Sequence, residues 1–172
     1  MEEELLPEPD SLEKKELLTV RQFVLLCLLS FNLYIVWWMY SSWRFFKFRQ
    51  DYSIQAALRT LIVPVYLYGL FRRIRLFAAE NSYASDYSPV LLFVGAILLS
   101  SLSALPEPLW LLSLLTLVCY IPPFKALNHG IEQCKDYETT RQTGFTTGQT
   151  IVLVVGGIFW ILIIIAFIFV RK

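Results

Sequence analysis

The stretch that decides the fold class is TIVLVVGGIFWILIIIAFIFV, residues 150–170, which is followed directly by Arg171 and Lys172. It contains no charged side chain. The hydrocarbon core of a bilayer is about 30 Å thick, and about 20 apolar helical residues are needed to cross it. Residues 150–170 therefore predict a transmembrane helix.

The composition of the whole chain agrees with that prediction. The mean hydropathy of the 172 residues is +0.56, and only 17% of them are charged, whereas a soluble domain has about 25%. The charges lie in clusters that are separated by long apolar runs. The net charge of +1 gives no overall field that would attract nucleic acid. We expect an all-α, polytopic transmembrane helical bundle with 4–5 membrane segments and short interfacial helices, and no nucleic-acid partner.

The N-terminal region differs from the rest. Residues 1–19 are acidic and contain Pro7 and Pro9, so they predict a mobile tail that ends in a short amphipathic stretch. A cleavable signal peptide is not expected, because the extreme N-terminus is acidic and the first apolar run is too long. Residues 20–172 are expected to form a single transmembrane domain.

The expected segments of that domain follow from the apolar runs. Residues 53–71 contain Arg59 and Pro64 and are predicted either to cross as a kinked helix or to re-enter as a hairpin. Pro122 and Pro123 are expected to end a tight hairpin, and the helix after them carries an apolar stripe that predicts a position on the membrane plane. The segments are about 22–43, 53–71, 89–105, 109–121 and 150–170, with the interfacial helix at about 124–138.

Two topologies remain open after counting Lys and Arg on each side of the membrane. With five spans, nine basic residues lie on the side of the N-terminus and five on the other, so the N-terminus is cytoplasmic. With residues 53–71 re-entrant there are four spans, the counts are ten and five, and both termini are outside. The five-span arrangement is preferred weakly, because the other must export the acidic tail.

A few side chains stand out as candidate contacts. Asn32 and Arg59 are polar groups inside apolar segments, where they need a partner helix or a lipid phosphate. Tyr66 lies seven residues after Arg59, on roughly the same helix face. An aromatic cluster at the end of the first segment is typical of the headgroup level; its members are Trp37, Trp38, Tyr40 and Trp43.

Small residues indicate where helices can approach each other closely. Ala96, Ser100 and Ala104 are spaced four apart on one face, and Gly156 and Gly157 lie inside the last segment. We expect these five positions to serve helix packing.

Residue types that carry chemistry are scarce. His129 is the single histidine, and with Glu132 and Cys134 it matches no established metal spacing. The three cysteines show no CxxC pair that would indicate a zinc site or a disulfide framework. The sequence therefore predicts no catalytic residue, no metal and no cofactor, and a protein that is not an enzyme.

The run Leu33-Tyr34-Ile35-Val36-Trp37-Trp38-Met39-Tyr40-Ser41-Ser42-Trp43 resembles the end of the first membrane helix in a family of small, aromatic-rich bacterial membrane proteins of unknown function. Ala57-Leu58-Arg59, Leu127-Asn128 and Gly156-Gly157-Ile158-Phe159-Trp160 resemble later blocks of that family. The resemblance covers roughly residues 30–165. It implies a multi-pass protein of the bacterial inner membrane, and it carries over no catalytic residue.

Three functions follow as hypotheses, in descending order of preference. The first is a non-enzymatic accessory or scaffold subunit, whose partners are membrane lipids and either other membrane subunits or further copies of the chain. The second is a small transporter or channel-like protein that uses Asn32, Arg59 and Tyr66 to line a path. The third is a membrane enzyme that acts on lipid.

Overall fold

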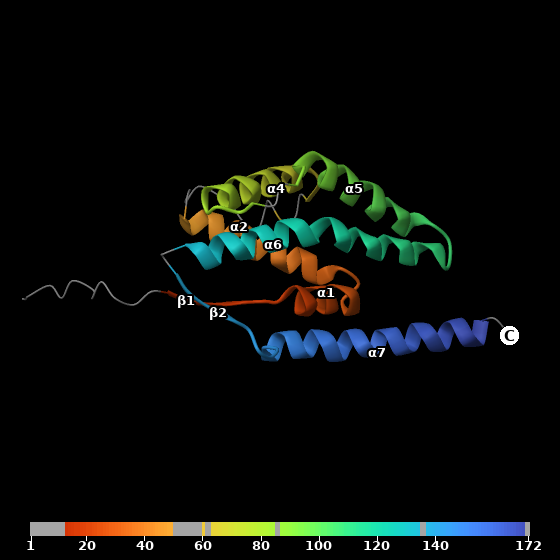
Figure 1. Ribbon diagram of the computed structural model, residues 1–172. Coiled ribbons are helices and arrows are strands. Elements are labelled where there is room, and N and C mark those ends of the chain that lie inside the picture. Colours follow the sequence, from red (N-terminus) through yellow and green to blue (C-terminus); the bar gives the residue numbers. More distant parts are fainter. Residues whose placement is uncertain (1–12, 50–59, 61–62, 85–86, 135–136, 171–172) are drawn as a thin grey trace, which may run out of the picture.

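A computed structural model describes residues 13–49, 60, 63–84, 87–134 and 137–170 of the chain (Figure 1). This part is mostly helical, with one small two-stranded sheet. Its elements in chain order are β1 (Glu13–Leu17), α1 (Val20–Leu29), α2 (Leu33–Arg49), α4 (Val63–Glu80), α5 (Pro89–Ser101), the 3-10 helices η1 (Leu102–Ala104) and η2 (Leu109–Thr116), α6 (Leu117–Gln133), β2 (Tyr137–Arg141) and α7 (Thr147–Val170).

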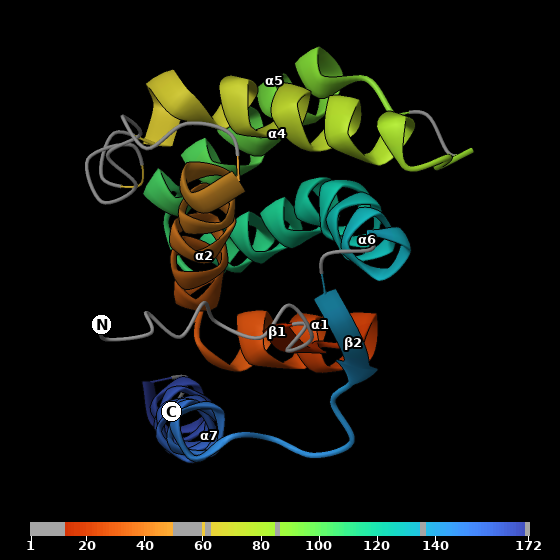
Figure 2. The same cartoon turned by 90° about the vertical axis from the view of Figure 1, so that its left-hand side faces the viewer.

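Two of these helices are long and apolar enough to cross a membrane, which favours membrane association. One is the continuous helical run of η2 and α6, Leu109–Gln133, and the other is Thr147–Phe169 of α7. They differ in packing, because 39% of the apolar stretch of the first is buried in the protein and only 6% of the second. Seen end-on, α7 lies beside α1 and away from α4 and α5 (Figure 2).

The prediction of one continuous helix over residues 22–43 is wrong. The chain reverses between α1 and α2 at Phe31 and Asn32, whose φ angles are 52° and 66°. Asn tolerates this left-handed conformation better than most residues. Ser30 stabilises the turn, since its Oγ accepts from the Tyr34 amide at 2.9 Å and donates to the Cys27 carbonyl at 3.3 Å. No charge marks the break, so hydropathy alone could not locate it.

The prediction that Pro122 and Pro123 end a helix is also wrong, because α6 continues through both to Gln133. A proline inside a helix costs about 3 kcal/mol through the lost amide donor and ring clash. Packing against α1, α4 and α5 offsets this cost. The stripe Phe124, Leu127, Ile131 is buried in the protein, so residues 124–133 are the end of a packed helix and not a separate helix on the membrane plane.

The expected tail ends in a strand and not in a helical turn. β1 pairs in parallel with β2, with Glu13 opposite Tyr137 and Leu17 opposite Arg141. Leu17 is buried, and its carbonyl accepts from the Gln142 amide at 2.9 Å. A two-stranded sheet is marginal alone, so it depends on the helices beneath it.

α4 covers the second half of the ambiguous segment 53–71, and residues 50–59 and 61–62 lie outside the described part. The helix does not end at residue 71, the predicted end of the segment, but continues to Glu80. The spacing of its buried residues explains this, because they form one face against α5 and α6 while Arg72 and Arg75 stay exposed. The buried face consists of Leu67, Leu70, Phe71, Ile74, Phe77 and Ala78.

The core is rich in aromatic rings where α1, α2, α4 and α6 meet. Phe23 stacks on Phe124 with ring centroids 4.2 Å apart, and the Trp38 ring lies edge-on to Phe23 at 5.7 Å. Trp38 and Trp43 are both buried here. The sequence predicted that these side chains anchor the protein at the headgroup level; in the structure they pack against other helices.

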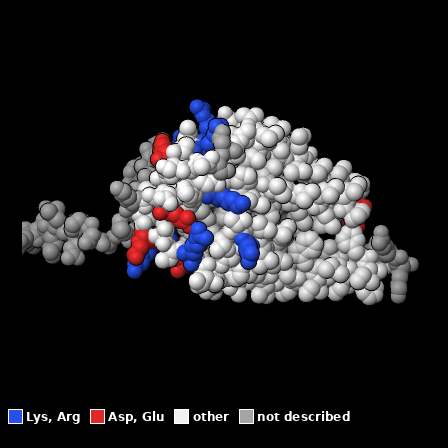
Figure 3. Space-filling view, in the orientation of Figure 1, with Lys and Arg blue, Asp and Glu red and all other residues white. Residues whose placement is uncertain are grey.

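Charge is distributed unevenly along the molecule. Every described Lys and Arg belongs to β1, α1, α2, α4, α6 or β2, and α5, η1, η2 and α7 contain no charged residue. Figure 3 shows the basic side chains gathered over one end of the visible face, with the opposite end almost free of charge. We call these the charged end and the apolar end. Glu107, in the turn between η1 and η2, is the exception.

Candidate functional site

A groove of about 730 Å³ lies between the α1–α2 turn and α7. One wall comes from the end of α1 and the start of α2, and the other from the first half of α7. Cavities that bind small molecules fall in the range of about 300–1,000 Å³. The lining residues are Leu29, Ser30, Phe31, Leu33, Tyr34, Trp37, Thr146, Gly148, Gln149, Ile151, Val152, Val155, Gly156 and Phe159.

The walls of the groove are apolar and largely uncovered. Trp37 is 59% exposed on the α2 side, and Val155 and Phe159 are exposed on the α7 side. Trp37 is one of the four aromatic residues that the sequence analysis singled out. Tyr40, another of the four, lies beside it with ring centroids 5.8 Å apart. Of the four predicted aromatic residues, only Trp37 lines the groove.

Gly156 sets the distance between the two walls. A methyl group at Gly156 would collide with the backbone carbonyl of Leu29, whereas one at Gly157 would meet nothing within 4 Å. Next along α7, the Trp160 Nε1 donates to the Leu28 carbonyl at 3.1 Å. Its ring also stacks on Phe31, with centroids 4.9 Å apart. The glycine and the tryptophan therefore fix α7 against α1.

One end of the groove is polar. Gln149 Oε1 accepts from Gln142 Nε2 at 2.9 Å and from the Thr146 amide at 3.0 Å. Its Nε2 donates to the Tyr34 hydroxyl at 3.4 Å. This network joins α2 to the first turn of α7. A polar end next to apolar walls gives the groove the character of an amphiphile site.

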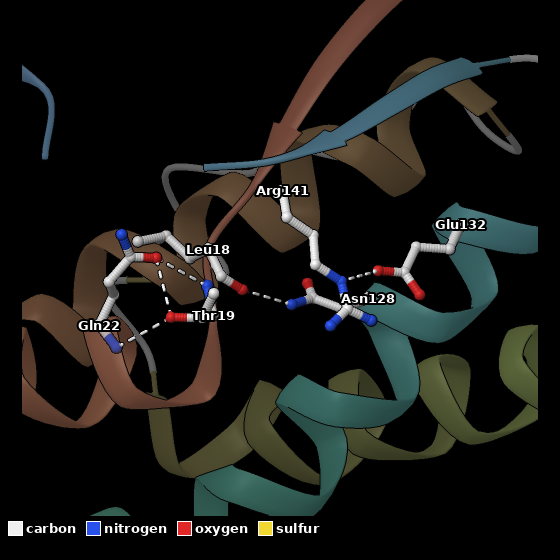
Figure 4. Close-up of polar contacts among 6 residues, drawn as sticks. All are labelled: Leu18, Thr19, Gln22, Asn128, Glu132 and Arg141. Carbon is white, nitrogen blue, oxygen red and sulfur yellow. Dashed lines mark hydrogen bonds and ion pairs between the residues drawn. The ribbon is translucent and has the colours of Figure 1, made fainter. Parts of the chain in front are cut away.

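Figure 4 shows a polar junction between the start of α1, α6 and β2. Thr19 and Gln22 form a capping box at the start of α1, in which the Thr19 amide donates to Gln22 Oε1 at 2.9 Å. Gln22 Nε2 also donates to the carbonyls of Gln142 and Gly144, at 3.3 and 3.2 Å. The loop before α7 is thereby held on α1.

Two further contacts join α6 to the same junction, as Figure 4 also shows. Asn128 Nδ2 donates to the Leu18 carbonyl at 2.9 Å, and Arg141 Nε donates to Glu132 Oε1 at 3.1 Å. A polar cavity of about 220 Å³ lies next to these residues and is lined by Lys125 and His129 as well. The His129 ring contacts Tyr83, with centroids 5.0 Å apart. No group of three or more His, Cys, Asp or Glu that could hold a metal occurs in the described ranges.

The structure does not bring Asn32 and Tyr66 together, although they were predicted to line one path with Arg59. The Asn32 Nδ2 donates to the carbonyls of Ser113 and Leu114, at 3.4 and 3.5 Å, so its partner is η2. Tyr66 is half-buried on α4 and lines neither the groove nor the polar cavity beside Arg141. Arg59 lies outside the described residues.

The residues predicted to serve helix packing differ in burial and in how closely another helix approaches them. Ala96 is buried, while Ser100 and Ala104 are exposed on the same side of the hairpin. Gly156 makes the closest helix contact and Gly157 makes none.

Sequence reasoning missed the polar network of Gln22, Gln142 and Gln149. The available signal was the presence of amide side chains in the first turns of two apolar helices, Gln22 in α1 and Gln149 in α7, where charged residues are more usual. Their partners lie far away in the chain, so the pairing itself is a property of the tertiary structure.

Comparison of the chain with protein-family models, with curated proteins and with solved structures finds no match. The resemblance to the small bacterial membrane family therefore rests on the residues quoted for it alone.

Proposed function

We propose that this chain is a non-enzymatic, membrane-embedded helical protein that acts as an accessory subunit and holds a transmembrane helix of a partner in the groove beside α7. The observation that carries the proposal is that α7 is long, uncharged and mostly exposed. It is a helix of 24 residues without a charge, only 6% of its most apolar stretch is buried, and the groove that it forms with α2 is open.

The distribution of charge suggests how the protein sits in the bilayer. The charged end holds every described Lys and Arg, and the positive-inside rule puts such an end in the cytoplasm. In this arrangement η2–α6 and α7 cross, α5 and η1 complete a hairpin with η2–α6, and Glu107 lies at the opposite surface. The arrangement is a proposed multi-pass topology of a cell membrane, and the bacterial inner membrane follows from the family resemblance.

In this arrangement α1 and α2 form a re-entrant hairpin, which enters from the charged end and returns. Irregular backbone at membrane depth is tolerated where protein satisfies its polar groups. The turn meets this condition in part, because the Leu28 carbonyl accepts from Trp160 and the Cys27 carbonyl from the Asn32 amide at 2.7 Å. Arg21 and Arg44 then belong to the same side of the membrane.

The groove supports a role in holding and not in bond-making. Its lining offers apolar carbon, the hydroxyls of Ser30, Tyr34 and Thr146, and the Gln149 amide. Helices in membranes associate through close packing and hydrogen bonds, not through the hydrophobic effect. An open groove with a polar group at one end provides both. The partner is another membrane subunit or a second copy of the chain.

A second candidate function is the binding of a lipid-like amphiphile. The observation that favours it is the position of Tyr34 and Gln149 at one end of a cavity whose other walls are apolar. In this alternative a neutral headgroup would contact the amide and hydroxyl while its chain lies along α7.

Photo-crosslinking in native membranes tests the proposal. A benzophenone side chain at Val155 lies in the groove, and one at Leu98, equally apolar and exposed on α5, is the matched control. We expect a discrete protein adduct from position 155 and none from position 98. A lipid adduct at 155 alone would favour the amphiphile site, and identical adducts at both positions would contradict both functions.

A further inference from the structure

A third cavity, of about 240 Å³, lies between the α1–α2 turn and the η1–η2 end of the hairpin. We call it the inner cavity. It brings together several neutral polar side chains from the α1–α2 turn, α5, η1 and η2. Its polar members, apart from Tyr120, are Asn32, Ser100, Ser103, Ser113 and Thr116.

Two polar atoms of the inner cavity have no protein partner. Thr116 is only 5% exposed, and its Oγ1 makes no hydrogen bond. The Oδ1 of Asn32 is also buried without a partner. The amide orientation is fixed, because only the NH₂ group can donate to the carbonyls of Ser113 and Leu114. A buried acceptor left unpaired is unfavourable and uncommon in proteins, so these atoms indicate an occupant.

The lining determines what kind of molecule can occupy the cavity. It contains no Asp, Glu, Lys, Arg or His, and a bare charge moved into such a site would lose its hydration without compensation. The occupant is therefore neutral. It must donate a hydrogen bond to Asn32 Oδ1, and it can exchange hydrogen bonds with the hydroxyls of Thr116 and the serines.

Buried side chains of the core form the floor of the cavity. Tyr120 and Met39, both buried, line it together with the polar residues. The Tyr120 ring packs edge-on against Phe71 at 5.4 Å and against Trp38 at 6.2 Å. This aromatic cluster lies in the core toward the charged end, whereas Ser100 and Ser103 are exposed. The cavity is therefore an open depression, bounded by the core on one side and exposed along the serines.

We infer that the inner cavity is a binding site for a small neutral molecule with several hydroxyl groups, of the class of glycerol and other short polyols. Its volume has room for several waters at about 30 Å³ each, and a short polyol supplies the same donors and acceptors in one molecule. The site is formed by the α1–α2 turn, α2, α5, η1, η2 and α6, and it shares only Phe31 with the lining of the groove. None of its polar residues lines the groove, so the inference does not rest on the proposed function.

Ligand-detected NMR on the full chain in deuterated detergent tests binding, with glycerol as the probe. Thr116→Val keeps the shape of the side chain and removes the hydroxyl. Ser101→Ala is the matched control, because the exposed Ser101 bonds only locally to the Leu98 carbonyl at 2.7 Å and lines no part of the cavity. We expect saturation transfer to glycerol from the wild type and from Ser101→Ala, and at least a fivefold weaker signal from Thr116→Val.

Thiol labelling gives a second measurement that does not depend on affinity. Cysteine at position 116 is compared with cysteine at the adjacent, buried position 117, which does not line the cavity. Peptide mass spectrometry separates both from the native cysteines. We expect neutral methyl methanethiosulfonate to label position 116 at least tenfold faster than position 117, and faster than charged methanethiosulfonates do.

The outcomes are decisive in either direction. Equal signals from Thr116→Val and Ser101→Ala would overturn the inference, as would equal labelling of position 116 by neutral and charged reagents. Labelling of position 116 without any glycerol signal would overturn it too, since the cavity would then admit only water and the reagent. The absence of a crosslinked adduct at position 155 would contradict the proposed function and would leave these binding and labelling results unchanged.

Discussion

At the scale of single residues, two adjacent glycines in α7 have opposite surroundings. Gly156 faces the Leu29 carbonyl of α1, and Gly157 faces open space. Glycine weakens a helix by about 1 kcal/mol relative to alanine. In α7 this cost is offset only where the missing side chain lets another helix approach closely. Gly156 meets that condition and Gly157 does not.

This difference leads to a paired prediction. Gly156→Ala should destabilise the protein by about 1–3 kcal/mol, the usual cost of overpacking, because α7 must move away from α1. Gly157→Ala should be neutral or slightly stabilising. Thermal unfolding in detergent, followed by far-UV circular dichroism, measures both variants. Equal melting temperatures would show that α7 does not pack on α1 through Gly156.

The residue scale also shows how far sequence reasoning reached. An asparagine inside an apolar run predicted that Asn32 needs a partner, and its amide bonds to η2. That Asn32 would also reverse the chain was not predicted, because the reversal depends on a positive φ that Ser30 and the η2 carbonyls stabilise together. The burial of Trp38 and Trp43 could not be derived either, since aromatic side chains suit a core and an interface equally well.

At the scale of elements, hydropathy located the apolar runs but not the points where helices break or continue. The runs at 89–105 and 150–170 correspond to α5–η1 and α7. The errors occurred where a local rule competed with packing: Pro122 and Pro123 lie inside α6 because three helices surround it. β1 was missed because its partner, β2, comes near the other end of the chain.

The small sheet gives a prediction at this scale. Leu17 is buried beneath the sheet while its neighbour Glu16 is exposed. Leu17→Ser should destabilise the junction by about 2 kcal/mol or more, in the range of large-to-small core substitutions, and should speed hydrogen exchange in residues 137–141. Glu16→Ser is the matched control and should leave exchange unchanged. Slow exchange in both variants would mean that the strand pairing does not depend on Leu17.

At the scale of the whole molecule, the separation of charge from apolar surface is the main feature. α5, η1, η2 and α7 contain no charged residue, and the described basic residues all lie on the remaining elements. Neither topology derived from the sequence has this arrangement, because both treated residues 22–43 as one crossing. When α1 and α2 form a re-entrant hairpin, Lys14 and Arg44 belong to the same end.

The orientation is a testable consequence. Cysteines placed at exposed positions 16 and 138, at the charged end, should react with a membrane-impermeant maleimide only in inside-out vesicles. A cysteine at position 107, in the hairpin turn, should react only from the other side. Reaction of positions 16 and 107 from the same side would contradict the proposed crossing of η2–α6.

The parallel pairing of β1 with β2 also determines the order in which the protein can be completed during synthesis. Gln22 and Gly144, which bond across the junction, are 122 positions apart, so the first strand leaves the ribosome long before its partner exists. Contacts between distant positions close late. Until translation reaches the end of β2, the nascent chain therefore contains β1 without its partner strand.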